Sequence, residues 1–135
     1  MIQIHMSDLY GQYLTMKEEI DSAIQEVIKS THFIKSGKVL DFEAKLADYL
    51  NTNVIACGNG TDALQIAFMA LGLQPGDEVI TTPFTFIATI EVISLLGLKP
   101  VFIDACPDTF NIDVSLIEEA ITDKTKVILP VHLFG

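Results

Sequence analysis

Hydrophobic positions along the chain change their spacing near residue 54. Before that point, apolar residues recur every three or four positions over residues 16–29 and again over 41–50, which is the spacing of amphipathic helices. The stretch STHFIKSGKV, residues 30–39, interrupts this periodicity. The pattern therefore predicts an N-terminal helical segment, residues 1–53, that contains two helices.

From residue 54 to residue 135, short apolar runs alternate with helical patterns. They predict strands over residues 54–57, 78–82, 101–104 and 126–131, and helices over 61–71, 88–96 and 114–121. Asp113 is the expected N-cap of the last helix. Because buried strands separated by helices of about ten residues are typical of parallel sheets, we predict an α/β fold over 54–135 with helices on both faces of a mostly parallel sheet.

Composition and charge narrow the class of protein. The chain has 135 residues, half of them hydrophobic, so we expect a packed core. It has eight lysines, no arginine and a formal charge of −10, which argues against a nucleic-acid partner. The apolar runs are too short to span a membrane, and no leader pattern is evident, so we expect a cytoplasmic protein. Cys57 and Cys106 lack the spacing of metal ligands, and we interpret both as reduced.

A glycine-rich turn, GNGTD, connects the expected strand 54–57 to the helix that follows it. The first amides of a helix have no partners within the helix and lie at the positive end of its dipole, where a phosphate can bind. Gly58 and Gly60 allow close approach of an anion, and Thr61 offers a hydroxyl donor. The alternative is a plain strand-to-helix turn made by Asn59 and the glycines, because the pattern matches neither a P-loop nor the dinucleotide fingerprint.

The stretch TTPFTFIAT follows the next expected strand. Ligands of open parallel sheets gather at the carboxyl ends of the strands, so this loop and the GNGTD turn should share one edge. Phe84 and Phe86 are either core residues or platforms for a planar ligand. His132 and Asp104 also follow strands. We interpret His132 as a structural residue bonded to nearby backbone, the alternative being that it faces the active site, and Asp104 as a cap or loop acceptor rather than a catalyst. A phosphate-binding site beside an aromatic ring on which a ligand can stack suggests a phosphorylated aromatic cofactor.

The chain resembles a known family over nearly its whole length. The stretches that carry the resemblance are DLYGQY, FIKSGKVLDFEAKLADYL, GNGTDALQIAFMALGLQPGDEVITTPFTFIATIEVISLLGLKPVFID, DTFNID and AITDKTKVILPVHLFG. In order and spacing they resemble the DegT/DnrJ/EryC1/StrS group of sugar aminotransferases, which depend on pyridoxal 5′-phosphate (PLP). The implied fold is the N-terminal part of the large domain of a fold-type I PLP-dependent transferase. The GNGTDAL form resembles members that aminate keto-sugars attached to a nucleotide.

The resemblance also implies roles for individual residues. Gly60, Thr61 and Asp62 would bind the PLP phosphate, mainly through backbone amides and the Thr61 hydroxyl. Phe86 would stack on the pyridine ring. Phe84 belongs to the same loop and is a less secure contact.

A further implied site lies in the segment between the two N-terminal helices. Ser36, Gly37 and Lys38 would lie near a substrate entrance formed by a homodimer. The alternative is a simple helix-joining loop with Gly37 in the left-handed conformation.

Transamination needs a lysine that bonds the cofactor and an acid that keeps the pyridine nitrogen protonated. In the family both lie beyond the position of Gly135, and the eight lysines here have the pattern of surface charges. We therefore expect a truncated chain that is inactive alone, with its first strand lacking its usual partner. The parent would aminate a nucleotide-linked keto-sugar from glutamate for surface polysaccharide or amino-sugar synthesis. The alternatives are a non-catalytic phosphate-binding α/β module and a lysine-less, dehydratase or regulatory relative.

Overall fold

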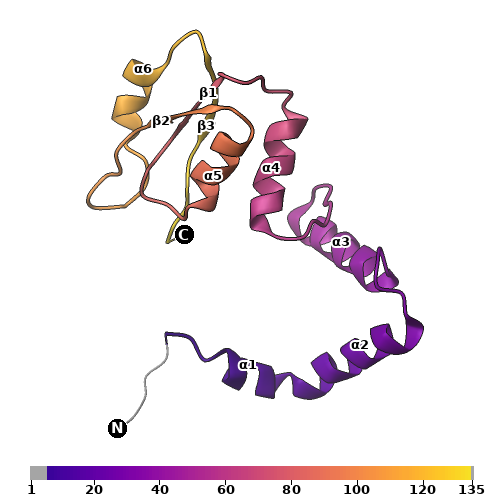
Figure 1. The fold of residues 1–135 in the computed structure, drawn as a ribbon. Coiled ribbons are helices and arrows are strands. Elements are labelled where there is room, and N and C mark those ends of the chain that lie inside the picture. The colour runs from indigo at the N-terminus through magenta and orange to yellow at the C-terminus, as the bar shows by residue number, and fades with distance from the viewer. Residues whose placement is uncertain (1–5, 135) are drawn as a thin grey trace. The chain divides into compact units, whose positions relative to one another are not determined.

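The computed structural model describes residues 6–134 and divides the chain into two compact units. The first unit covers Met1–Ala56 and the second covers Cys57–Gly135 (Figure 1). None of the described residues of the first unit is buried, whereas the second unit contains a buried core. We describe each unit by itself. No described helix is both long enough and apolar enough to cross a membrane.

The first unit consists of helices α1 (Leu9–Thr15), α2 (Lys17–Ser30) and α3 (Gly37–Leu50). The helices predicted over 16–29 and 41–50 are confirmed, although α3 begins four residues earlier than expected. Helix α1 was not predicted, because it has only two turns and carries Gly11 in its interior. Its N-cap is Asp8, whose Oδ1 accepts a hydrogen bond of 2.8 Å from the Gly11 amide.

The connection between α2 and α3 differs from the expected loop. Gly37 is the first residue of α3 and does not adopt the left-handed conformation, so that expectation was wrong. The left-handed residues are Thr31 and Lys35, with φ of 56° and 47°. Because the chain turns at these two positions, Ser36 is already extended and can precede the helix directly.

The second unit is a three-stranded parallel sheet with helices on both faces, which confirms the predicted fold class. Its elements are α4 (Gly60–Ala70), β1 (Glu78–Thr81), α5 (Ala88–Leu95), β2 (Lys99–Phe102), η1 (Val114–Leu116), α6 (Ile117–Ala120) and β3 (Thr125–Leu129). The strand order is β2-β1-β3, with β1 in the centre and parallel to both neighbours. The Asp113 cap is also confirmed, since its Oδ1 accepts a 3.0 Å bond from the Ser115 amide.

The strand predicted over residues 54–57 was wrong. Within the described part of the chain this segment pairs with no strand, and Ile55 is 87% exposed. Its Ala56 amide instead donates to Glu43 Oε1 at 2.7 Å. The other strands shift by one or two residues at their ends: β1 ends at Thr81, β2 covers Lys99–Phe102 and β3 begins at Thr125. Strand β3 ends at Leu129 because Pro130 has no amide hydrogen to extend the ladder.

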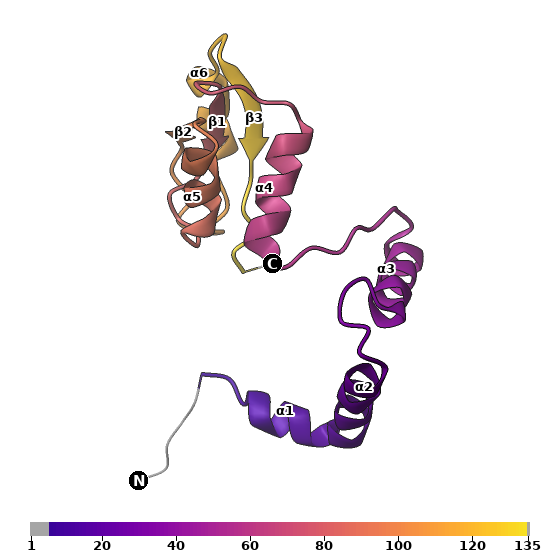
Figure 2. The ribbon, with the colours of Figure 1, turned by 45° about the vertical axis from the view of Figure 1, so that its right-hand side comes forward.

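The central strand β1 supplies both faces of the core. Successive side chains of a strand point to opposite faces, and all four residues of β1 are buried. Val79 packs with Phe68, Val92, Ile93 and Leu98 on the face covered by α4 and α5. Ile80 packs on the other face with Ile103 and Ile112, next to Ile117 and Ala120 of α6. Both ribbon views show α6 on the opposite side of the sheet from α4 and α5 (Figures 1 and 2).

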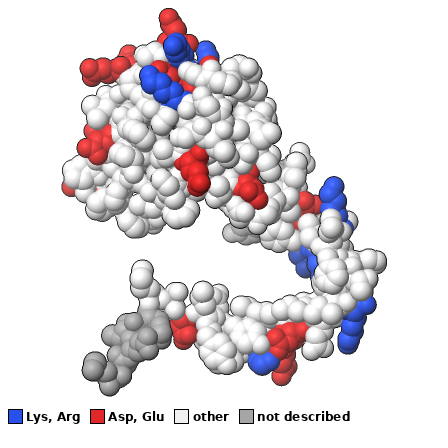
Figure 3. All heavy atoms as spheres, in the orientation of Figure 1, with Lys and Arg blue, Asp and Glu red and all other residues white. Residues whose placement is uncertain are grey.

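Hydrogen bonds and an ion pair close the amino edge of the sheet. Glu78 begins β1, and its two carboxylate oxygens accept bonds from Lys99 Nζ at 2.9 Å and from Thr122 Oγ1 at 2.6 Å. Its amide donates to the Lys124 carbonyl at 2.8 Å. The Thr122 hydroxyl, followed by Lys99, holds the pKa of Glu78 below its usual value. Acidic and basic side chains of this unit gather over this edge, around the turn between α6 and β3 (Figure 3).

Candidate functional site

A cavity of about 440 Å³ lies at the opposite, carboxyl edge of the sheet, within the second unit. Its walls come from the start of α4, from the loop after β1 with the start of α5, and from the segment after β3. The lining residues are Gly60, Thr61, Leu64, Thr85, Phe86, Ala88, Thr89, Val131, His132 and Leu133. The two motifs that the sequence placed at one edge, GNGTD and TTPFTF, therefore meet in one cavity. Its size is within the range of small-molecule sites.

The first turn of α4 is fixed by Asn59, a residue that sequence analysis named only in the alternative of a plain strand-to-helix turn. Asn59 Oδ1 accepts a 3.0 Å bond from the Asp62 amide, and Asn59 Nδ2 donates to Asp62 Oδ2 at 3.1 Å. The Asp62 carboxylate lies so close to Gly58 that a Cβ there would be 2.6 Å from Oδ2. A side chain at position 58 would therefore displace the Asp62 carboxylate. The available signal for Asn59 was its residue type, since asparagine is a favoured N-cap.

Two amides at the start of α4 remain open. The Asp62 and Ala63 amides bond to Asn59, but the Gly60 and Thr61 amides have no acceptor among the described residues. A Cβ added at Gly60 would meet nothing within 4 Å, so the approach to the backbone there is clear. Both residues line the cavity at the positive end of the helix dipole. This corner of the cavity has the groups of an anion-binding site.

Asp62 has a different position from the one expected of a backbone phosphate contact. Its amide is already bonded, and its carboxylate orders the loop through Asn59. A direct contact between Asp62 and a phosphate stays a prediction.

Phe86 lines the same cavity with most of its ring exposed. Its exposed fraction is 71%, and the ring is absent from both described core clusters. The loop that carries it is held by the Thr89 amide, which donates to the Phe86 carbonyl at 3.2 Å. The hydroxyls of Thr85 and Thr89 bond to each other at 2.9 Å. An exposed aromatic face beside an anion-binding site suits a planar, phosphorylated ligand.

Phe84 has no place in the lining of this cavity. Its ring packs against Phe110, at 5.7 Å between ring centroids, and against Phe134, at 6.3 Å. Phe84, two residues before Phe86 in the loop, therefore makes packing contacts where the sequence suggested a possible ligand contact.

The two other strand-end residues have different roles. Asp104 is a loop acceptor as expected, because its Oδ1 accepts a 2.8 Å bond from the Ala105 amide. His132 lines the cavity, and its imidazole makes none of the side-chain hydrogen bonds found in the described residues. The expected bond from this imidazole to nearby backbone is therefore not found in residues 6–134, and the alternative position facing the site agrees with the cavity lining.

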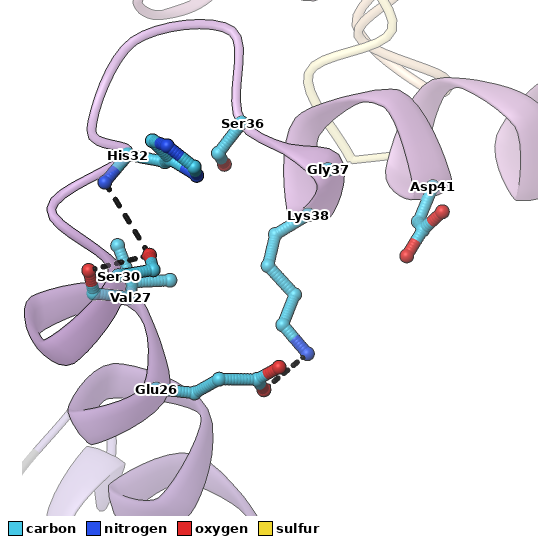
Figure 4. Close-up of a pocket in the computed structure, with 8 residues that line it drawn as sticks. All are labelled: Glu26, Val27, Ser30, His32, Ser36, Gly37, Lys38 and Asp41. Carbon is cyan, nitrogen blue, oxygen red and sulfur yellow. Dashed lines mark hydrogen bonds and ion pairs between the residues drawn. The ribbon is translucent and has the colours of Figure 1, made fainter.

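Ser36, Gly37 and Lys38 lie in the first unit and line a separate cavity of about 230 Å³. Figure 4 shows the Lys38 side chain pointing to Glu26, with Nζ 2.8 Å from Oε2. The Glu26 carboxylate raises the pKa of Lys38. His32 lines the same cavity, and its amide donates to Ser30 Oγ at 3.3 Å. A role of this segment in substrate binding stays a prediction. No group of side chains suited to hold a metal ion occurs in residues 6–134.

Comparison with known proteins identifies the class to which this fold and cavity belong. The family model for DegT/DnrJ/EryC1/StrS aminotransferases matches residues 14–135. The chain belongs to this family, as its motifs predicted.

Two curated relatives and two solved structures illustrate the similarity. The chain is 49% identical over 98% of its length to UDP-2-acetamido-2-deoxy-3-oxo-D-glucuronate aminotransferase of Pseudomonas aeruginosa. It is 50% identical over 99% of its length to a pleiotropic regulatory protein of Geobacillus stearothermophilus. S. venezuelae DesV in complex with a ketimine intermediate matches 100% of the chain with a TM-score of 0.95 and 37% identity. NtdA of Bacillus subtilis, with bound cofactor PMP, matches 90% with a TM-score of 0.86 and 44% identity.

The chain spans only part of each of these proteins. It covers 37% of the P. aeruginosa enzyme, 36% of the G. stearothermophilus protein, 37% of the DesV chain and 28% of the NtdA chain. The structure therefore matches part of fold-type I aminotransferase structures.

Proposed function

We propose that the protein carrying this chain is a PLP-dependent aminotransferase and that this chain supplies the seat for the cofactor phosphate and one face for its ring. The observation that carries the proposal is the cavity in which the open Gly60 and Thr61 amides lie with the exposed ring of Phe86. A relative in the same family was solved with the related cofactor PMP. When bound, PLP supplies an electron sink for amino-group chemistry.

The phosphate is assigned to the start of α4. The two open amides donate to it, the Thr61 hydroxyl adds a charge-assisted donor, and the helix dipole favours its negative charge. No lysine lines this cavity, and the chain has no arginine. In this chain the anion is therefore held by backbone and hydroxyl groups.

The ring is assigned to Phe86. An exposed phenylalanine face gives a planar ligand a large apolar contact and restricts its orientation. Gly60, Thr61, Asp62 and Phe86 form the proposed cofactor site, with Asp62 acting through the Asn59 cap. The lysine that must bond the cofactor is assigned to a part of the protein outside this chain, so the chain alone is proposed to be inactive.

The proposed substrate is a nucleotide-linked keto-sugar, with glutamate as the amino donor. The P. aeruginosa relative, named for a UDP-linked 3-oxo sugar acid, supports this class. The proposed assembly is a homodimer, with Ser36, Gly37 and Lys38 near the substrate entrance and Phe84 close to the site. The proposed role is in surface polysaccharide or amino-sugar biosynthesis.

A second candidate is regulation without transamination. It is favoured by the 50% identity to a protein named as a pleiotropic regulator. Incubation of the full-length protein with a UDP-linked 3-keto sugar and glutamate separates the two candidates. Formation of an amino sugar supports the enzyme, and binding without turnover supports the regulator.

The cofactor site is tested by titrating the full-length protein with PLP and with inorganic phosphate. Thr61→Val removes one hydroxyl donor and should weaken PLP binding by about 1 to 3 kcal/mol, which is roughly 5- to 150-fold. Thr52→Val, the same change at an exposed threonine of the first unit, should leave the affinity unchanged. Equal affinities of the two variants would remove Thr61 from the phosphate seat, and a wild-type protein that binds no PLP would refute the proposed function.

A further inference from the structure

Three phenylalanine rings from three separate loops meet at the carboxyl edge of the sheet. Phe84 follows β1, Phe110 follows β2 and Phe134 follows β3. The Phe110 centroid lies 5.7 Å from that of Phe84 and 5.7 Å from that of Phe134, with the last contact edge to face. The Phe84 and Phe134 rings are 6.3 Å apart. We call these three rings the aromatic brace, since all three distances are within the range of favourable aromatic pairs.

The aromatic brace borders the candidate cofactor cavity without lining it. Phe84 lies directly before Thr85 and Phe86, both of which line the cavity. Phe134 lies directly after His132 and Leu133, which line the facing wall. Phe110 lies in a loop that contributes no residue to the cavity lining. Its ring contacts Phe84, which flanks one wall of the cavity, and Phe134, which flanks the facing wall.

The backbone around Phe110 is arranged to present this ring. Phe110 has a φ of 59°, in the left-handed region that bulky residues seldom adopt. The conformation is held by two backbone bonds of 2.8 Å, from the Phe110 amide to the Cys106 carbonyl and from the Cys106 amide to the Asn111 carbonyl. An antiparallel bridge between Ala105 and Ile112 closes the loop. The loop is thus fixed independently of the two walls that its ring contacts.

We propose that Phe110 is a positioning residue for the cofactor site, acting through Phe84 to hold Phe86 where its ring faces the open amides of α4. Phe84 and Phe86 are two residues apart, and the loop between them is further tied by the 2.9 Å bond between the Thr85 and Thr89 hydroxyls. Phe86 therefore lies between Phe84, whose ring is packed, and Thr89, whose hydroxyl bonds to Thr85 and whose amide bonds to the Phe86 carbonyl, so its backbone has little freedom to turn away. This inference rests on the proposed function, because it assigns a cause to the position of Phe86.

The test is a double-mutant cycle in the full-length protein, measured by titration with PLP. Phe110→Asn removes the ring and keeps a residue that tolerates the left-handed conformation, and Phe86→Ala removes the stacking face. In the parent protein, Phe110→Asn should weaken PLP binding about tenfold, which corresponds to the loss of one or two aromatic contacts. In the Phe86→Ala background the same change should have less than about a twofold effect, because no ring remains to be positioned.

Inorganic phosphate is the probe that separates positioning from general structural damage. It should bind at the start of α4 equally well, within about twofold, with or without Phe110→Asn, because the Asn59 cap is untouched. Phe102→Ala is the matched control, since Phe102 is exposed on β2 and outside the aromatic brace. It should leave PLP affinity unchanged. If Phe110→Asn does not fold, Phe134→Ala, which removes an exposed member of the aromatic brace, should show the same dependence on Phe86.

Three results would overturn this inference while the proposed function stands. The first is an equal loss of PLP affinity from Phe110→Asn in both backgrounds, and the second is no loss in either. Parallel loss of PLP and phosphate binding would also overturn it, because Phe110→Asn would then disturb the whole carboxyl edge of the sheet and not the position of Phe86 alone. A wild-type protein that binds no PLP would instead refute the proposed function, and the inference with it.

Discussion

The two edges of the parallel sheet use their polar groups in opposite ways. At the amino edge, both carboxylate oxygens and the amide of Glu78 are bonded, and they tie the starts of β1 and β2 to the turn before β3. At the carboxyl edge, the Gly60 and Thr61 amides face a cavity and have no acceptor among the described residues. Bonded groups contribute to folding, whereas open groups are available to a ligand. The contrast assigns stability to one edge and binding to the other.

The lysines follow the same division. Those of the second unit lie around the amino edge together with acidic side chains, and further acidic side chains lie elsewhere on this unit (Figure 3). No lysine or acidic residue lines the cavity at the carboxyl edge, where the attraction for an anion comes from the helix dipole and backbone amides. In a chain with a formal charge of −10, this arrangement lets an anion bind locally. The three predictions below test how separate the two edges are.

The largest expected effect comes from the core beneath both edges. Ile93 of α5 is fully buried against Val79, so Ile93→Ala should lower the free energy of unfolding by about 2 to 5 kcal/mol. Leu95, two residues later on the same helix, is 67% exposed, and Leu95→Ala should change it by less than about 0.5 kcal/mol. Chemical denaturation measures both values. Similar losses from the two variants would contradict the core described here.

A smaller effect is expected at the Asn59 cap. Asn59→Ala removes the acceptor of the Asp62 amide and should lower the free energy of unfolding by about 1 kcal/mol, the usual cost of a lost N-cap. PLP affinity should fall as well, because the loop that exposes the Gly60 and Thr61 amides is no longer fixed. Asn59→Ser restores a capping oxygen and should recover most of both losses. Full affinity in Asn59→Ala would show that the cap does not shape the site.

The smallest expected effect is a pH dependence at the amino edge. Because the folded-state pKa of Glu78 lies below its usual value of 4.5, its ionised form stabilises the fold above that pH, and the contribution is lost as the pH falls through the folded-state value. Glu78→Gln should therefore be less stable than the parent at pH 7, and the difference should disappear at an acidic pH below the folded-state pKa of Glu78.

Denaturation at the two pH values provides this measurement. Asp123→Asn removes a nearby exposed carboxylate that makes no side-chain hydrogen bond in the described structure, and it serves as the control. It should differ from the parent equally at both values. A constant difference for Glu78→Gln would show that the ionised carboxylate has no special role.

Local patterns predicted much of the fold and the position of the site. The 3.6-residue periodicity located α2 and α4, and the rule that ligands gather at the carboxyl ends of parallel strands brought Thr61 and Phe86 to one edge. Both residues do line one cavity. These features were accessible because they depend on residues close together in the chain or on general sheet geometry.

Features that depend on distant partners were missed or wrong. An apolar run such as 54–57 becomes a strand only when another strand pairs with it, and none of the described strands does so. The aromatic brace joins residues 26 and 24 positions apart along the chain, from Phe84 to Phe110 and from Phe110 to Phe134, which no local pattern reports. A left-handed Gly37 was one of two alternatives for the segment between α2 and α3, based on residue type alone, but Lys35 has that conformation instead.

The separation of the two edges is tested most directly by one crossed measurement on the full-length protein. PLP affinity and the free energy of unfolding are determined for Thr61→Val at the carboxyl edge and for Glu78→Gln at the amino edge, at pH 7. The account predicts that Thr61→Val loses affinity and keeps its stability, while Glu78→Gln loses stability and keeps its affinity. If either variant lost both, the two edges would not be separate and the assignment of binding to the carboxyl edge alone would be contradicted.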